Sequence, residues 1–547
     1  MAIFTGTNGN DGFPGTANPD IFNMFQGGND TVTGDLGNDV FNFLNTFNSS
    51  DSITGGGGND TLTLSGDYSA QLLITSAMLS SVERITVAPE HSYNLAIGNG
   101  VIAPGGSLII SATKLGVADT LQIDTTAVVG RGAPATTVIL GGAGPTLITA
   151  GAEPLFLHGS TGQDSVQFGA TFNTSDNLDG VSGVGDNIHL DGDYSAGLVI
   201  IGTMMRNFDS LFVDDSFNYR LTLQDGVVAA GGSLNVFVAS PGIAGNLYFD
   251  GSQETDGAFS VYDGIGNDVL RGGAEGDFLE GSAGNDKLYG MDGNDTLSMA
   301  DGLTSLDRID GGNDYDTLLL TGDYSAGVHI TATMVKNVEA IYANPGGDYR
   351  ISTADSLVAA GLTLDVSAPT LVAGDWLKFN GSAETDGNFN ISSAAGKDTL
   401  IGGAGNDSFW AGKGSDLLTG NGGSDTFTYL NLVESRANLH DTITDFDAAA
   451  DHFKLAAFLT TPTAVDAAVA GTLNAATYTT DLVTALDAAH LGAHHAAVFT
   501  ASGGDLTGHS FLVVDVNGVA GYQLAGDLLV DITGAANLGS FGIGDFI

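Results

Sequence analysis

An aspartate that recurs every nine residues is the feature that most constrains how this chain can fold. Residues 266–299 read GNDVLRGGAEGDFLEGSAGNDKLYGMDGNDTLSM, with glycines between the aspartates. Each aspartate is followed two places later by a leucine, in the pairs Asp268 and Leu270, Asp277 and Leu279, Asp286 and Leu288, and Asp295 and Leu297. A strict short period places the same side chain at the same point of successive structural repeats. The sequence therefore favours short, nearly identical turns that stack on one another.

The same period returns in other parts of the chain. A second strict run contains Asp398, Asp407, Asp416 and Asp425, a looser N-terminal set contains Asp11, Asp30 and Asp39, and single copies end at Asp60 and Asp164. Asp20 is left out of the predicted set because its segment, GTANPDIFN, lacks several of the glycines. The turn glycines that we expect to contribute to the sites are Gly272, Gly273, Gly281, Gly284, Gly402, Gly403 and Gly405.

The pattern G-G-x-G-x-D-x-U-x, where U is a large apolar residue, suits a hard cation. Glycines bend the backbone tightly, so that several carbonyl oxygens converge and one carboxylate completes the shell. A shell of six to eight oxygens favours Ca²⁺ over Mg²⁺ or Zn²⁺. Folding should then be coupled to metal binding. Simple Gly-Asn-Asp turns remain an alternative for the isolated copies at Asp60 and Asp164, but not for the strict runs.

Composition supports bound cations and excludes several classes of protein. The chain has 547 residues, with 15 Lys and Arg against 64 Asp and Glu, which gives a formal charge of −49. That charge fits either a solvated acidic surface or cations within the folded state. It argues against binding to nucleic acid, whose affinity rests on neutralising phosphates, and against anionic membranes. There is no cysteine, so bound metal ions, rather than disulfides, are expected to stabilise the fold.

The sequence has no feature of a conventional route across or into a membrane. The N-terminal sequence MAIFTGTNGNDGFPG has no basic and apolar regions of a cleaved secretory signal. No apolar run is long enough for a transmembrane helix. We therefore expect no membrane insertion. The protein either stays in the cytoplasm or leaves the cell by a route that recognises another part of the chain.

A longer repeat divides the chain into blocks. GDYSA occurs at 66–70, 192–196 and 322–326, and GSQETDGAFSV at 251 returns as GSAETDGNFNI at 381, 130 residues later. We predict degenerate repeats at 1–54, three blocks at 55–182, 183–310 and 311–430, and a separate domain at 431–547. Short alternating runs such as VHIT and LTLDVS predict an all-β, parallel β-solenoid or β-roll, with an antiparallel sandwich as the alternative. Ala-rich segments after 430 predict one or two helices within a small mixed domain.

The strict nonapeptides resemble the RTX (repeats-in-toxin) family. The segment SDTFTYLNLVESRANLHDTITDFDAAADHFKL is similar to the C-terminal RTX and secretion region of serralysin-like and surface-layer-like proteins. The resemblance implies that the aspartates and turn glycines named above bind several Ca²⁺ ions. It also implies export by a type I secretion system that reads an uncleaved C-terminal signal, and folding outside the cell at high calcium.

No recognised catalytic motif interrupts the repeats. H-E-x-x-H, G-x-S-x-G and a complete Walker A loop are all absent from the sequence. The best paired carboxylates for glycoside chemistry are Glu254 with Asp256 and Glu384 with Asp386, but their recurrence in two blocks favours a structural or ion-binding role. DVNGVAGYQLAGD, at 515–527, is a further candidate calcium loop, although it lacks the complete ligand series of an EF-hand.

We therefore expect an extracellular, calcium-dependent, non-catalytic structural protein that assembles into a cell-surface layer or matrix. Its expected partners are further copies of itself and a type I exporter, with cell-surface polysaccharide as another candidate. An RTX adhesin or carbohydrate-binding protein is the first alternative, and a secreted glycan-active enzyme is the second. The pair His490 and His494 could share a metal, but no third ligand is evident, and a plain helix surface is the favoured interpretation.

Overall fold

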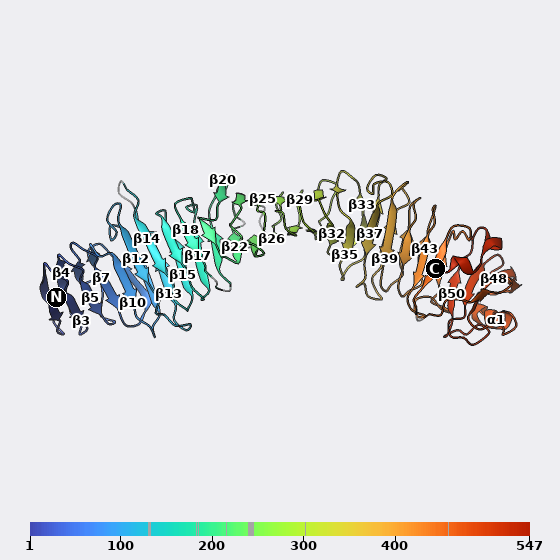
Figure 1. Ribbon diagram of the computed structural model, residues 1–547, viewed down its shortest axis with the longest axis horizontal. Helices are drawn as coiled ribbons and strands as arrows, with labels where there is room; N and C mark the ends of the chain where they lie inside the picture. The colour runs from blue at the N-terminus through green and yellow to red at the C-terminus, as the bar shows by residue number, and fades with distance from the viewer. Residues whose placement is uncertain are drawn as a thin grey trace. The chain divides into compact units, whose positions relative to one another are not determined.

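A computed structural model describes residues 1–129, 133–181, 183, 185–214, 216–238, 245–300, 302–457 and 459–547 of the chain. The chain separates into two compact units, Met1–Leu279 and Glu280–Ile547, coloured blue to green and green to red in Figure 1. One short strand, β28 (Phe278–Gly281), crosses the boundary between them along the chain. The block boundary predicted at residue 182 lies outside the described residues. The five-part division by sequence repeats remains a prediction.

The first unit is a solenoid in which each turn of the chain contributes one strand to each face. The strands of successive turns pair in parallel, and each such row of paired strands is called a ladder. One ladder contains β1 (Ile3–Thr5), β3 (Ile21–Met24), β5 (Val40–Phe43), β7 (Thr61–Leu64), β10 (Arg84–Val87), β12 (Ser107–Ser111), β14 (Thr136–Leu140), β16 (Leu155–His158), β18 (Asn177–Asp179) and β21 (Met205–Arg206). Another contains β8 (Tyr68–Ile74), β11 (Tyr93–Ile97), β13 (Leu121–Asp124), β15 (Thr146–Ala150), β17 (Asp164–Phe168), β19 (Asn187–Leu190), β22 (Ser210–Val213), β24 (Ser233–Val238) and β26 (Ala258–Tyr262). Two shorter ladders are β2 (Gly12–Thr16), β4 (Thr31–Asp35), β6 (Ser52–Thr54) and β9 (Leu79–Ser80), and β20 (Tyr194–Ile200), β23 (Tyr219–Gln224), β25 (Leu247–Gln253) and β27 (Val269–Arg271).

The second unit continues this architecture and ends in a mixed region. Its ladders are β29 (Lys287–Met291), β31 (Arg308–Gly312) and β34 (Val335–Lys336); β30 (Thr296–Met299), β32 (Thr317–Leu320), β35 (Ala340–Ala343), β37 (Thr363–Ser367), β39 (Asn388–Ser392), β41 (Ser408–Trp410), β43 (Thr426–Tyr429) and β45 (His452–Leu455); and β33 (Tyr324–Ile330), β36 (Tyr349–Thr353), β38 (Leu377–Asn380), β40 (Thr399–Ile401), β42 (Leu417–Thr419) and β44 (Asp441–Ile443). The remaining elements are β46 (Ala464–Val465), β47 (Val469–Thr472), α1 (Tyr478–Ala485), β48 (His495–Gly503), β49 (Ser510–Val514), β50 (Leu528–Asp531) and the short 3₁₀ turns η1 (Leu538–Ser540) and η2 (Ile543–Asp545).

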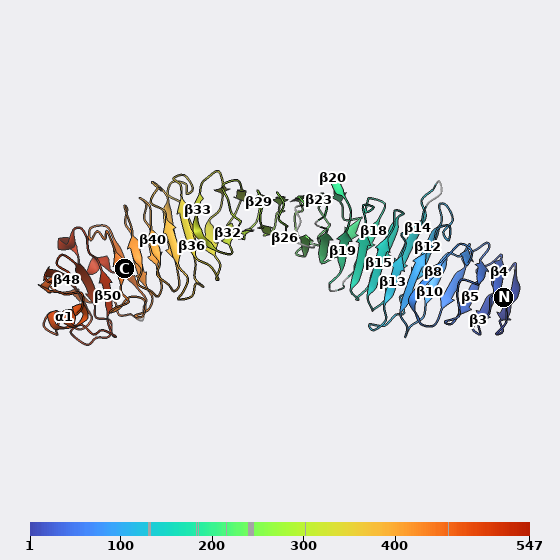
Figure 2. The ribbon, with the colours of Figure 1, turned by 180° about the vertical axis from the view of Figure 1, so that it is seen from behind.

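The apolar residue of each repeat forms the core, as the period predicts. Leu288 pairs in register with Ile309, and Leu297 with Leu318, one coil further on. These four side chains are almost completely buried. Because successive strands keep the same register, apolar residues lie above apolar residues along each ladder, and both views show these strands running side by side (Figure 2). The predicted all-β parallel solenoid is confirmed, and the ladder strands within the described residues do not form an antiparallel sandwich.

The C-terminal region joins the coil through a parallel contact and then changes character. β44 pairs in parallel with β50, whereas β49 pairs antiparallel with both β50 and β48. Among the described residues after 430 there is one α-helix, at the lower end of the predicted number. This helix, α1, ends at Ala485, so His490 and His494 lie in turns beyond it and the helix-surface interpretation was wrong.

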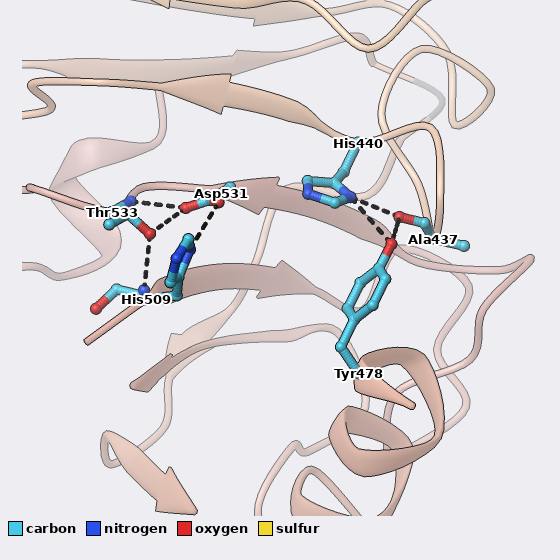
Figure 3. A network of polar contacts seen from close by, with 7 residues as sticks. Ala437, His440, Tyr478, His509, Asp531 and Thr533 are labelled. Atoms are coloured by element: carbon cyan, nitrogen blue, oxygen red, sulfur yellow. Dashed lines mark hydrogen bonds and ion pairs between the residues drawn. The ribbon is translucent and has the colours of Figure 1, made fainter. Parts of the chain in front are cut away.

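Two small polar clusters fix this C-terminal region (Figure 3). The Tyr478 hydroxyl, on the first residue of α1, donates to the Ala437 carbonyl at 2.8 Å, and His440 Nδ1 lies 2.6 Å from the same oxygen. In the second cluster, Asp531 accepts from the backbone N–H of Thr533 at 2.8 Å and lies 3.4 Å from His509 Nδ1. The first cluster therefore ties the helix to the segment that precedes β44.

Candidate metal centre

The aspartates of the nonapeptides form ladders of their own. Asp60 Oδ1 accepts the backbone N–H of Asp39 at 2.8 Å, and Asp39 Oδ1 accepts that of Asp20 at 2.7 Å. Each carboxylate therefore bonds to the backbone of the equivalent aspartate one coil earlier. Hydrogen bonds from an amide to a charged acceptor are stronger than neutral ones, so the ladder also fixes the register of the coil.

The same bond recurs along both units. In the first unit the ladders are Asp11–Asp30–Asp51, Asp20–Asp39–Asp60–Glu83 and Asp164–Asp186–Asp209. In the second they are Asp286–Asp307, Asp295–Asp316–Glu339, Asp398–Asp416–Asp441 and Asp407–Asp425–Asp451. Asp268 and Asp277 make the equivalent bond to the N–H groups of Leu247 and Phe259, each at 2.6 Å.

The spacing of these bonds explains the period of nine. Bonded aspartates in the strict second run are 18 residues apart, as between Asp398 and Asp416 and between Asp407 and Asp425. One coil therefore contains two nonapeptides, and alternate aspartates belong to two separate ladders. Where a longer loop is inserted, the bonded partners are 21 to 26 residues apart, but the bond itself is unchanged.

Asparagines in the same turns, such as that of the Gly-Asn-Asp triplet at 405–407, form a parallel series. Asn388 Oδ1 accepts the N–H of Asn406 at 2.7 Å, and Asn406 Oδ1 accepts that of Ser424 at 2.7 Å. The asparagine side chain therefore bonds to the coil that follows it, while the neighbouring aspartate bonds to the coil before it. The triplet satisfies the backbone of the turn in both directions. The second carboxylate oxygen either accepts a local N–H, as at Asp407, or has no donor, as at Asp39.

Glycines form a close-fitting cradle at that second oxygen, because their backbone can approach it directly. A Cβ at Gly402, five residues before Asp407, would lie 2.1 Å from Asp407 Oδ2, and the same distance separates a Cβ at Gly420 from Asp425 Oδ2. A Cβ at Gly34 would lie 2.3 Å from both Asp39 Oδ2 and the carbonyl oxygen of Gly55. Carboxylate and carbonyl oxygens thus converge where only glycine fits. Carboxylate and carbonyl oxygens are the ligand types that Ca²⁺ prefers, so the donor set fits Ca²⁺.

Several of these carboxylates are buried without a donor. The Oδ2 atoms of Asp39, Asp60, Asp316, Asp398 and Asp416 are inaccessible to solvent and make no hydrogen bond. Burial raises the pKa of Asp60 and of Asp398 to about 6, and burial together with the charge of Asp451 raises that of Asp425 to about 8. An unpaired buried charge is strongly unfavourable, so the folded state requires either protons or cations at these positions.

Every predicted aspartate lies in one of these rows. The eight from the strict runs, together with Asp30, Asp39, Asp60 and Asp164, are buried, whereas Asp11 is partly exposed. The backbone N–H groups of Gly273 and Gly403 donate to Asp277 and Asp407 at 2.6 and 2.7 Å. Gly405 has no room for a Cβ, Gly284 has a φ of 154°, Gly272 is buried, and Gly281 is adjacent to Asp286. Which of these residues coordinate an ion remains a prediction.

Sequence reasoning missed several members of the ladders. Asp20, which the prediction left out, is buried and bonds to the backbone of Ala2 at 2.7 Å. The other missed positions are Asp51, Asp186, Asp209, Asp307, Asp316, Asp441 and Asp451, with Glu83 and Glu339 at ladder ends. Each of these seven aspartates lies at or just before the start of a short strand and is followed two places later by an apolar residue, as in SDSIT and DYDTLLL. That D-x-U-x signal, without the glycines, would have identified them.

In the ETDG segments, which contain the paired carboxylates, the glutamate bonds to the backbone of its own loop. Glu384 Oε1 accepts the backbone N–H groups of Thr385, Asp386 and Gly387 at 3.1 to 3.3 Å, and the side chain is 1% exposed. In the equivalent loop of the preceding block, carboxylate oxygens of Glu254, Asp225 and Asp256 lie within 4.8 Å of one another. This arrangement orders a turn and could also accept a cation.

The loop at 515–527 brings two buried carboxylates together. Asp515 Oδ1 accepts the N–H of Gly518 at 2.7 Å, and Asp527 Oδ2 accepts that of Gln523 at 2.6 Å. Burial, followed by the charge of Asp515, raises the pKa of Asp527 to about 7. The loop therefore shares the chemistry of the ladder sites, and calcium binding there remains a prediction.

Comparison with protein families agrees with this geometry. The model for the RTX calcium-binding nonapeptide repeat (4 copies) matches residues 26–41, 48–67, 262–297 and 393–427. These segments contain the aspartates of both strict runs and, in the N-terminal part, Asp30, Asp39, Asp51 and Asp60. The matches support an RTX-type, calcium-binding protein of the secreted kind. No curated protein matches the chain. Among the described residues, no helix is both long and apolar enough to cross a membrane.

Proposed function

We propose that this protein is exported by a type I secretion system, folds when it meets extracellular calcium, and assembles into a non-catalytic layer or matrix at the cell surface. The observation that carries the proposal is the row of buried carboxylates with Oδ2 atoms that lack a donor and face a glycine cradle. Such a row is unfavourable without cations and favourable with them.

Calcium-dependent folding gives the export route a physical reason. At low cytosolic calcium the carboxylates of each ladder remain charged and repel one another, so the chain stays unfolded and can pass through an exporter. At millimolar calcium outside the cell the ions neutralise the ladders, and the strands between them propagate from coil to coil. The C-terminal region from residue 431 is the expected carrier of the export signal.

Charge and the absence of catalytic motifs support assembly as the end point. Many of the 64 acidic residues lie outside the ladders, and calcium can bridge acidic surfaces of neighbouring copies. The carboxylates that most resembled a glycosidase pair are engaged with backbone amides, as at Glu384. Both points favour a structural role over catalysis.

A calcium titration tests the proposal. Purified protein in chelator is titrated to millimolar calcium while circular dichroism and light scattering are followed together, and the product is imaged by negative-stain electron microscopy. We expect strand formation followed by ordered sheets. Folding to a stable monomer would overturn assembly but not calcium binding, and no spectral change would overturn both.

A pair of charge-neutralising variants provides the control. Asp407→Asn removes a ladder carboxylate, and we expect it to raise the calcium concentration at the folding midpoint several-fold. Asp323→Asn changes an exposed aspartate whose bond to the Ser325 N–H an asparagine can also make. Equal midpoints for the two variants would show that total charge, rather than the ladder, governs folding.

A further inference from the structure

A polar cleft on the outer face of the second unit is not explained by calcium binding. It has a volume of about 320 Å³ and lies over β32, β35, β37 and β39. Its principal side chains are Tyr315, Tyr342, Asp365, Ser367, Asn390 and Ser392. Two aromatic rings, one carboxylate, one amide and two hydroxyls therefore meet in one hollow on a rigid sheet.

The polar groups of the cleft are held in a fixed arrangement. Tyr315 donates its hydroxyl to Asp365 Oδ2 at 2.6 Å, and Asn390 Nδ2 donates to Asp365 Oδ1 at 2.9 Å. The hydroxyls of Ser367 and Ser392 are 2.9 Å apart. In the described part of the chain no Lys or Arg forms an ion pair with Asp365. Each carboxylate oxygen accepts one bond, so both retain acceptor capacity toward a ligand.

Tyr315 enters the cleft from an unusual position in the repeat. Its backbone N–H donates to Asn294 Oδ1 at 3.0 Å, the bond that positions an asparagine in other coils. Partial burial, with the bond to Asp365, raises the pKa of Tyr315 to about 12, so the phenol remains a hydrogen-bond donor at ordinary pH. Its side chain is 47% exposed, which leaves part of the ring available for contact.

The preceding block shows that the fold does not require this hollow. The residues 130 positions earlier than Tyr342, Ser367 and Ser392 are Phe212, Phe237 and Tyr262. Those three rings stack in register at centroid distances of 5.2 and 5.0 Å and form a continuous outer row. The later block keeps the first ring of this row and replaces the next two with serines.

The remaining polar groups are also particular to the later block. Asp365 stands where the earlier block has Asn235, and Tyr315 stands where it has Gly185. The later block therefore has two serines where the earlier block has two rings, and a carboxylate and a phenol lie beside the space that those rings would fill. A hollow with convergent polar groups on an otherwise filled face indicates a ligand site.

We propose that this cleft binds a neutral sugar unit of a polysaccharide. The rings of Tyr315 and Tyr342 offer apolar surface to the C–H groups of a pyranose, while Asp365, Asn390 and the serines offer partners for its hydroxyls. An anionic sugar is disfavoured by Asp365 and by the charge of −49. A lone carboxylate is a poor calcium site, which separates this cleft from the ladders. The proposal is independent of assembly.

Binding to immobilised polysaccharides tests it. Calcium-loaded full-length protein is passed over dextran, mannan, galactomannan and laminarin by surface plasmon resonance, with anionic alginate as the comparison. We expect binding to at least one neutral polysaccharide and weaker binding to alginate. No binding to any of the four, or equal binding to alginate, would overturn the proposal.

Variants taken from the earlier block locate the site. Ser367→Phe with Ser392→Tyr fills the cleft with the rings found at the same register 130 residues earlier, so the coil should fold, and we expect at least a tenfold loss of affinity. Asp365→Asn, which is nearly isosteric, should weaken binding about tenfold because it removes a charged acceptor. Circular dichroism confirms folding of each variant.

The matched control is Asn235→Asp, which places the carboxylate where the rings leave no hollow. It should leave polysaccharide binding unchanged. Unchanged binding in the filled variant, or an effect on light scattering without an effect on polysaccharide binding, would overturn the proposal and point to contact with a second copy of the chain.

Discussion

At the scale of single residues, a glycine and the aspartate five places later act as one unit. Gly402 is required because a Cβ would lie 2.1 Å from Asp407 Oδ2, a separation that real Cβ atoms do not tolerate. The same pair recurs at Gly420 with Asp425. The glycine therefore does more than permit a turn, because it lets the carboxylate oxygen lie closer to the backbone than any side chain would allow.

Gly402→Ala tests this unit. We expect the added methyl to displace Asp407 Oδ2 and to raise the calcium concentration at the folding midpoint several-fold, as followed by circular dichroism. Gly374→Ala is the control, because no atom lies within 4 Å of its Cβ position. If both variants folded at the same calcium concentration, the cradle would have no part in binding.

The buried carboxylates predict an inverted pH dependence in the absence of calcium. The pKa of Asp425 is raised to about 8, and that of Asp398 to about 6, because burial disfavours the charged form. A raised folded-state pKa gives stability that is complete below the unfolded value of about 4 and is lost as the pH rises through 6 to 8. In chelator, the protein should therefore resist urea better at pH 5 than at pH 8.5.

Calcium should reverse this trend, because the ion competes with protons for the same oxygens. Urea unfolding at both pH values, with and without calcium, measures the effect. Greater stability at pH 8.5 in chelator would show that the carboxylates are already compensated without a metal.

At the scale of elements, the sequence predicted the strands better than the connections. The apolar U positions identified the inward residues, such as Leu288 and Leu297, because a strict period fixes which side chain faces the core. The period was less informative where loops were inserted. Asp441 joins its ladder 25 residues after Asp416, and no fixed spacing could predict that distance.

The candidate site was likewise predicted in part. One carboxylate in each nonapeptide was evident, since the glycines mark it. The bond from each Asp to the coil before it was not, because it joins residues whose proximity depends on the whole coil. The cleft at Asp365 could not be predicted without knowing the register, although comparison with Asn235 in the preceding block shows the substitution.

The contact of α1 with the coil gives a prediction at this scale. Tyr478→Phe removes the hydroxyl that donates to the Ala437 carbonyl at 2.8 Å, and we expect it to loosen the helix by about 1 kcal/mol. Amide hydrogen exchange across α1, measured by mass spectrometry, should accelerate about fivefold. Tyr262→Phe is the control, since that hydroxyl has no hydrogen-bond partner within the described ranges. Unchanged exchange in α1 would contradict the proposed tie.

At the scale of the whole molecule, the coil of two nonapeptides is the unit of construction. Asp398 and Asp416 occupy successive rungs of one ladder, while Asp407 and Asp425 occupy the other. Deleting 399–416 therefore removes one complete coil and joins Asp398 to the strand β42 that normally follows Asp416. Deleting 399–407 removes half a coil and transfers every later strand to the wrong ladder.

The two deletions should behave oppositely even though the shorter one removes less of the chain. The 18-residue deletion should still fold with calcium, and bind fewer ions, because nearest-neighbour contacts are restored at the junction. The nine-residue deletion should disrupt the C-terminal region, whose strand β50 pairs with β44 of a single ladder. Circular dichroism during a calcium titration, together with measurement of bound calcium, compares them. If both deletions folded equally well, the two ladders would be interchangeable, and the distinction between alternate aspartates would not govern assembly of the coil.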